Sequence, residues 1–112
     1  MAQIIEETIE AAKAYATDAK ERAYGTHRSN LAHHQREAFF YEMMCEYLYA
    51  AFGPYIYGEV EMDEEVTARM EAYIFHCEQK MAAYKVFVEE AMKAERDRLA
   101  AFLETKAAYT AA

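Results

Sequence analysis

Three histidines and a glutamate form the closest approach to a metal site in this sequence. His33 and Glu37 lie one helical turn apart, His34 adjoins them, and His76 comes from a later segment. Imidazole and carboxylate groups are common ligands of transition metals. A di-iron bundle needs histidine three residues after glutamate on two helices, and no glutamate here has that partner. The alternative is a His33–Glu37 surface salt bridge with His34 and His76 packed and hydrogen-bonded. We therefore predict no metal and no cofactor.

Two carboxylates and two thiols are the other residues that could carry chemistry. Glu42 and Glu46 lie one turn apart, and in a dry site they would raise each other's pKa, as catalytic acid–base pairs do. The alternative, which we favour, is that they face solvent. Cys45 and Cys77 have neither C-x-x-C nor zinc-like spacing and lie in apolar stretches, which is typical of reduced core cysteines. The sequence predicts no catalytic residues and a cytoplasmic location.

The composition excludes several classes of function. The three glycines are isolated, so phosphate-binding and dinucleotide-binding loops are absent. The net charge of −8 disfavours contact with nucleic acid and with anionic membranes, and acidic and basic residues alternate without forming a basic patch. No window of about 18 residues is free of charge, so we expect no membrane-spanning helix.

The chain is expected to form one all-α domain, residues 1–112, because helix-forming residues dominate and turn signals are rare. Three helices are predicted, at about 3–24, 30–52 and 64–109. The first ends at Gly25 and has a stripe of alanines, the second ends before Gly53-Pro54, and Asp63 can cap the third.

The third predicted helix has an apolar pattern that recurs every eleven residues. One position holds Val66, Cys77, Val88 and Leu99, and a second holds Met70, Met81, Met92 and Leu103. Such a repeat predicts nearly straight or slightly right-handed, coiled-coil-like packing. The two shorter helices, paired side by side, would cover only half of the third helix. The predicted oligomer interface therefore consists of Val88, Met92, Leu99, Phe102 and Leu103.

Ten tyrosines and no tryptophan are an unusual aromatic content for 112 residues. Tyrosine combines a large apolar body with a polar tip and is frequent where proteins meet. Several aromatic and apolar residues gather where the second helix ends. The predicted partner-binding surface consists of Tyr47, Tyr49, Phe52, Tyr55, Ile56 and Tyr57. A tyrosine-rich core with its hydroxyls at the surface is the alternative.

The leading hypothesis is a non-enzymatic protein–protein interaction or assembly protein that forms a homo-oligomer, binds another protein, or does both. The first alternative is a small acidic inhibitor, of viral or mobile-element type, that occupies the nucleic-acid-binding site of a partner protein. Its acidic patch would imitate phosphates and would consist of Glu59, Glu61, Asp63, Glu64 and Glu65. The second alternative is a metal-binding helical bundle that uses His33, His34, Glu37 and His76.

Overall fold

The structure is a computed structural model that describes residues 2–24 and 30–111. Helix α1 spans Ala2–Tyr24, α2 spans Asn30–Ile56 and α3 spans Glu64–Ala111, and the described residues contain no strand. The predicted all-α class and its three helices are thus confirmed. Gly25, the predicted end of the first helix, lies outside the described residues.

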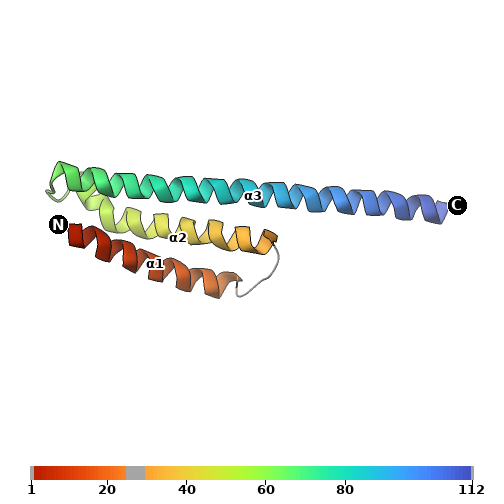
Figure 1. Ribbon diagram of the computed structural model, residues 1–112, viewed down its shortest axis with the longest axis horizontal. Coiled ribbons are helices and arrows are strands. Elements are labelled where there is room, and N and C mark those ends of the chain that lie inside the picture. Colours follow the sequence, from red (N-terminus) through yellow and green to blue (C-terminus); the bar gives the residue numbers. More distant parts are fainter. Residues whose placement is uncertain (1, 25–29, 112) are drawn as a thin grey trace.

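The three helices form an elongated bundle in which α1 and α2 accompany only one half of α3. Helix α2 lies between α1 and α3, packs against both, and runs antiparallel to each of them (Figure 1). The far half of α3 projects beyond both shorter helices, and the molecule measures 75 × 23 × 17 Å. None of these helices combines the length and the apolar character needed to cross a membrane.

The core lies at the end of the bundle where α2 turns into α3. Its largest fully buried side chains are Met44, Leu48 and Phe52 of α2 with Met70 and Cys77 of α3. Beyond Cys77, no described side chain of α3 is buried. The hydrophobic stabilisation of α3 by its own chain is therefore concentrated in its first four turns.

The alanine stripe of α1 lets this helix lie close to its neighbours. Ala12 and Ala16 are fully buried, Ile5 is 4 % exposed, and Ile9 packs against the core. Ala23, the last member of the predicted stripe, is exposed because α1 is near its end there. Small side chains supply little apolar area each, so α1 depends on the bulky residues of α2 for its stability.

Helix α2 ends later than the sequence predicted. Its last turn includes Pro54, and the backbone N–H of Tyr57 donates to the carbonyl of Gly53 at 2.9 Å. Proline removes one helical hydrogen bond, but Tyr55 and Ile56 pack against the core and hold the final turn in place. The chain reverses at Gly58, whose φ of 77° is a conformation that glycine adopts without steric cost.

Helix α3 begins at the cap that the sequence predicted. The Asp63 carboxylate accepts a hydrogen bond from the backbone N–H of Glu65 at 2.8 Å. Glu64 and Glu65 occupy the first turn, where carboxylates complement the helix dipole. From this cap the helix continues for 48 residues as one element.

The eleven-residue repeat of α3 becomes steadily more exposed along the helix. Val66 and Cys77 are buried, Val88 is half-buried, and Leu99 is 57 % exposed. The second row changes in the same way, from buried Met70 to Leu103, which is 53 % exposed. The shorter helices thus cover the first half of the repeat, and its packing in an assembly stays a prediction.

Both cysteines are free and buried between α2 and α3. Burial, and secondarily the nearby Cys45 thiol, raises the pKa of Cys77 from an ordinary value of 9.0 to about 11. Burial also raises the pKa of Cys45, with Glu78 and Glu42 acting in the same direction. Folding therefore favours the neutral thiols, which are weak nucleophiles.

We expect the thiols of the folded protein to resist alkylation at pH 8 and to react quickly once the chain is unfolded in denaturant. The stabilisation that follows from keeping Cys77 neutral is complete below pH 9 and falls as the pH rises towards 11. Iodoacetamide labelling followed by mass spectrometry measures the first effect, and denaturant unfolding at several pH values measures the second. Equal labelling rates in the folded and unfolded states at pH 8 would contradict this description of the core.

Candidate functional site

The far part of α3 is a helix without cover from its own chain. We call residues 92–111 the overhang, and every described side chain from residue 92 to residue 108 is exposed. Met92 is 43 % exposed and Leu99 is 57 % exposed, and Phe102 reaches 63 %. At 1.5 Å per residue, the overhang is about 30 Å long. Between Met92 and Leu103 it presents large apolar side chains to solvent over about three helical turns.

The five residues predicted for the oligomer interface divide into two groups. Met92, Leu99, Phe102 and Leu103 lie on the overhang and are exposed. Val88 is half-buried, because it faces α2 at the place where that helix begins to cover α3. The overhang therefore contains the four residues that remain open to another chain.

The residues predicted for the partner-binding surface divide between core and surface. Phe52 is 1 % exposed and belongs to the core, and Tyr55 and Ile56 pack against that core while remaining half-exposed. The Tyr47 ring lies 5.6 Å from the ring of Tyr15 on α1. Tyr49 is 46 % exposed and Tyr57 is 75 % exposed, so these two offer the most surface.

Tyr49 and Tyr57 belong to a groove that the sequence did not reveal. We call it the aromatic groove. It lies between the end of α2 and the start of α3 and has a volume of about 270 Å³. Its lining consists of Tyr49, Ile56, Tyr57, Glu71, Ile74, Phe75 and Glu78. The Tyr49 hydroxyl donates a hydrogen bond to the Glu78 carboxylate, which connects the two walls.

Phe75 is the member of this groove that sequence reasoning missed. It is 58 % exposed, so it contributes apolar surface that its own chain does not bury. It stands outside the eleven-residue rows that were singled out on this helix. The signal that could have found it is its seven-residue spacing from Ala82, which places both on one face of α3.

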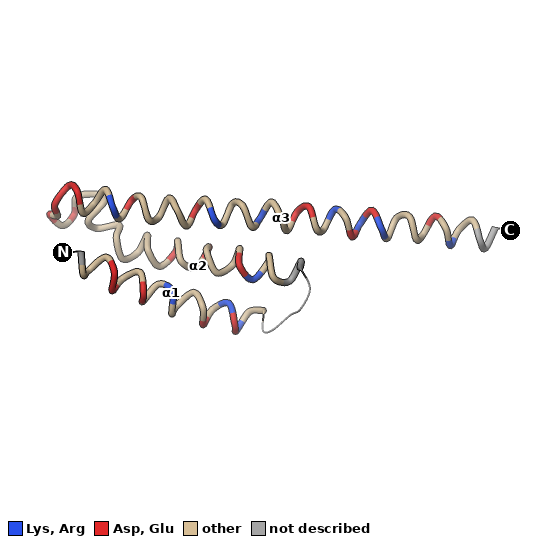
Figure 2. The backbone as a smooth tube through the Cα atoms, viewed as in Figure 1, with Lys and Arg blue, Asp and Glu red and all other residues tan. Residues whose placement is uncertain are grey.

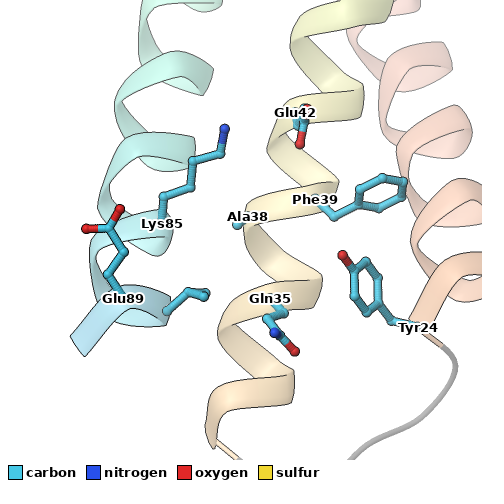
Figure 3. Close-up of a pocket in the computed structure, with 8 residues that line it drawn as sticks. Tyr24, Gln35, Ala38, Phe39, Glu42, Lys85 and Glu89 are labelled. Carbon is cyan, nitrogen blue, oxygen red and sulfur yellow. The ribbon is translucent and has the colours of Figure 1, made fainter. Parts of the chain in front are cut away.

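A second groove, which we call the Lys85 groove, lies farther along the same α2–α3 boundary and has a volume of about 310 Å³. Figure 3 shows Lys85 and Glu89 extending from α3, with Gln35 and Glu42 on the facing helix. Glu42 and Glu46 are both exposed, which places this carboxylate pair on the solvent side of α2.

The acidic run surrounds the turn between α2 and α3, at the end of the molecule opposite the overhang (Figure 2). Glu59, Glu61, Asp63, Glu64 and Glu65 are all exposed. Asp63 is used to cap α3. Within the described residues, no hydrogen bond or ion pair joins the other four carboxylates to a basic group.

The structure does not gather the four candidate metal ligands. The rings of His33 and His34 lie 5.5 Å apart, and His34 packs at 5.1 Å from Phe87. His76 lies farther back along α3, beside Tyr73. Glu37 forms an ion pair with Lys20 of α1 at 3.4 Å. Within the described residues, no three histidine, cysteine or acidic side chains are placed to hold one metal ion.

An aromatic cluster surrounds the histidines at the start of α2. The rings of Tyr41 and Tyr84 stack at 5.9 Å with an angle of 12° between their planes. Burial raises the pKa of the Tyr41 hydroxyl, and the neighbouring Tyr84 and Glu37 act in the same direction. Burial thus favours the neutral form of the Tyr41 hydroxyl. The cluster is a packed contact between α2 and α3 rather than a reactive centre.

The described surface thus includes an uncovered apolar stretch of helix, an exposed acidic run, and grooves between α2 and α3 with aromatic, aliphatic and charged linings. Comparisons of the chain with the profiles of known protein families, with characterised proteins and with solved structures gave no significant match, so a functional interpretation rests on its own residues.

Proposed function

We propose that this chain is a non-enzymatic assembly protein that binds other protein chains through helix packing, a second copy of itself among them. The overhang of α3 is the observation that carries this proposal. It exposes Met92, Leu99, Phe102 and Leu103 on a part of α3 that neither α1 nor α2 reaches. Contiguous exposed apolar surface of this kind is characteristic of protein interaction sites.

The energetics of an isolated helix support the same proposal. A helix of about 20 residues without tertiary contacts is only marginally stable in water, since most helical stability in proteins comes from packing. The overhang has the length of such a helix and no described contact with α1 or α2. A partner that covers its apolar face would supply the missing packing free energy.

The two grooves support binding rather than catalysis as the proposed role. The aromatic groove is lined by exposed tyrosine and phenylalanine rings, which dominate the energetics of many interfaces. The free, buried cysteines accord with a chain that works in the reducing cytoplasm, which is the location we propose.

The double substitution Met92→Asp with Leu99→Asp tests this proposal. We expect the wild-type protein to elute with a mass of at least twice 13.0 kDa and the variant to elute as a single chain, because two carboxylates would have to be desolvated in the interface. Size-exclusion chromatography with light scattering measures the mass. Circular dichroism should show that α1 and α2 remain folded.

Ala94→Asp with Ala101→Asp is the matched control. It adds the same two charges at exposed positions of the overhang on the face away from Met92 and Leu99. This control variant should keep the wild-type mass. A wild-type protein that elutes as one chain at all concentrations would refute self-assembly.

The acidic run supports a second candidate function, an inhibitor that occupies a nucleic-acid-binding site on a partner protein. The observation in its favour is that all five acidic side chains are exposed together at one end of the molecule. An array of carboxylates can attract a basic surface over a distance of about 8–10 Å at moderate salt.

Salt dependence separates this candidate from binding through tyrosines. The tagged chain is used to capture its protein partner from a cell lysate. If the acidic run binds the partner, the amount of captured partner should decline steeply between about 50 and 300 mM salt. It should also be lost when Glu59→Gln, Glu61→Gln and Glu65→Gln are combined. If the tyrosines bind it, capture should persist in salt and decline with Tyr49→Ala and Tyr57→Ala. Quantitative mass spectrometry of the captured proteins measures both effects, and loss only with the tyrosine variant would contradict the inhibitor hypothesis.

A further inference from the structure

One uncovered stripe of apolar and charged side chains runs along α3 from the aromatic groove to the overhang. Its positions, charged ones included, succeed one another at the alternating three- and four-residue intervals of a two-stranded coiled coil, and its apolar members are seven, ten, seven and four residues apart. All of them are exposed: Phe75, Ala82, Met92, Leu99 and Leu103. Beside the first part of this stripe lie the buried side chains that face α2, such as Ile74 and Cys77. A heptad stripe drifts by about 20° per seven residues around a straight helix, so on the overhang it turns onto the continuation of the α2-facing side. We call this uncovered stripe the seam.

The charged members of the seam are arranged by sign. Glu71 and Glu78 occupy its first part, beside the aromatic groove, and Arg96 lies on the overhang. Lys85 and Glu89 stand between them and line the Lys85 groove. Acidic side chains therefore precede basic ones along the seam, except at its centre, where one residue of each sign is present.

We infer that a second copy of this chain binds along the seam with its α3 antiparallel to the first, the two-fold axis passing near position 87. In this alignment Phe75 faces Leu99 of the second copy, and Ala82 faces Met92 of the second copy. Two-fold symmetry repeats each pairing, so both overhangs become covered and the assembly closes as a dimer. This inference rests on the self-assembly proposed above and specifies its geometry.

Charge complementarity selects the antiparallel direction. The same alignment places Glu78 opposite Arg96 of the second copy and Lys85 opposite Glu89 of the second copy, which gives four ion pairs of opposite sign by symmetry. In a parallel pair in register, each of these residues would face its own copy, so every one of these pairs would be repulsive. Opposite charges that meet across an interface favour that orientation, and like charges that meet disfavour it.

The distribution of charge over the whole chain agrees with this direction. The overhang has four lysines or arginines and three acidic residues, for a net charge of +1. Residues 1–91 have eight lysines or arginines and seventeen acidic residues, for a net charge of −9. Antiparallel association places the overhang of each copy beside the acidic half of the other, whereas parallel association would place the two acidic halves together.

The aromatic groove receives an occupant in this arrangement. Phe102 lies three residues beyond Leu99, at the edge of the seam. It is on the side of α3 that α2 covers in the first half of the helix. In the antiparallel alignment it lies beside Ile74 of the second copy, which lines the aromatic groove with Tyr49 and Phe75. Phe102 is 63 % exposed and Phe75 is 58 % exposed, so their contact would bury two large aromatic side chains at once. The exposed tyrosine surface and the exposed overhang would then be two halves of one interface.

Charge reversal within the seam tests the alignment. Glu78→Arg and Arg96→Glu each create two like-charge pairs in the dimer, and each should weaken dimerisation by about tenfold. The double variant restores opposite charges and should return the dissociation constant to about the wild-type value. Positions 78 and 96 are about 27 Å apart along one helix, so recovery in the double variant can arise only between copies. Sedimentation equilibrium of the full chain measures the dissociation constant.

Two controls keep this experiment decisive. Glu90→Arg with Arg98→Glu makes the same two reversals at exposed positions outside the seam, and neither the single nor the double change should alter dimerisation. Glu78→Arg also removes the acceptor of the Tyr49 hydroxyl, but Arg96→Glu affects no such bond and tests the pairing independently.

The outcomes separate the inference from the proposed function. A wild-type protein that sediments as a single chain overturns both. A wild-type dimer that neither single reversal weakens, or a double reversal without recovery, overturns the antiparallel seam and leaves self-assembly standing. A disulfide-linked dimer formed by Leu99→Cys alone under mild oxidation would show that the copies are parallel, because that side chain then faces its own copy.

Discussion

The mismatch in helix length is the constraint from which the rest of this structure follows. Helix α3 has 48 residues, whereas α1 and α2 have 23 and 27 and lie side by side rather than end to end. Two short antiparallel helices can cover only the part of α3 that they accompany. The core is therefore confined to the first half of α3, and a long apolar stripe is left open.

The capped turn between α2 and α3 fixes where that coverage begins. Asp63 starts α3 with a carboxylate-to-backbone hydrogen bond, and Gly58 reverses the chain with a positive φ. The buried rings and methionines of α2 then align with the first turns of α3. Because α2 and α3 both extend from this turn and α3 is the longer, the overhang projects from the other end of the bundle.

The sequence predicted those features that depend on local chemistry and periodicity. Three helices, the cap at Asp63 and the burial of both cysteines follow from residue type and spacing, and each is confirmed, while the alanine stripe of α1 is buried at Ala12 and Ala16 but not at Ala23. The end of α2 was predicted too early because Pro54 usually stops a helix, whereas packing of Tyr55 and Ile56 on the core sustains another turn here. Tertiary packing outweighed the local signal at that point.

Features that depend on which helix covers which face could not be predicted in the same way. Phe52 was assigned to a surface together with its tyrosine neighbours, yet it is buried in the core, whereas Tyr49 lies at the rim of the α2–α3 contact, where its hydroxyl reaches Glu78. Phe75 was overlooked because apolar residues on α3 were assumed to serve one stripe, whereas this helix has a covered face and an open one. Separating the two required knowing the position of α2.

The central claim is that another protein chain covers the overhang. Hydrogen–deuterium exchange of residues 92–108 at several protein concentrations tests it most directly. Amides there should be strongly protected at high concentration and should lose protection as dilution separates the chains, while amides near Leu48 and Met70 stay protected throughout. Rapid exchange of the overhang that does not vary with concentration would contradict the claim, because the helix would then stand alone in solution.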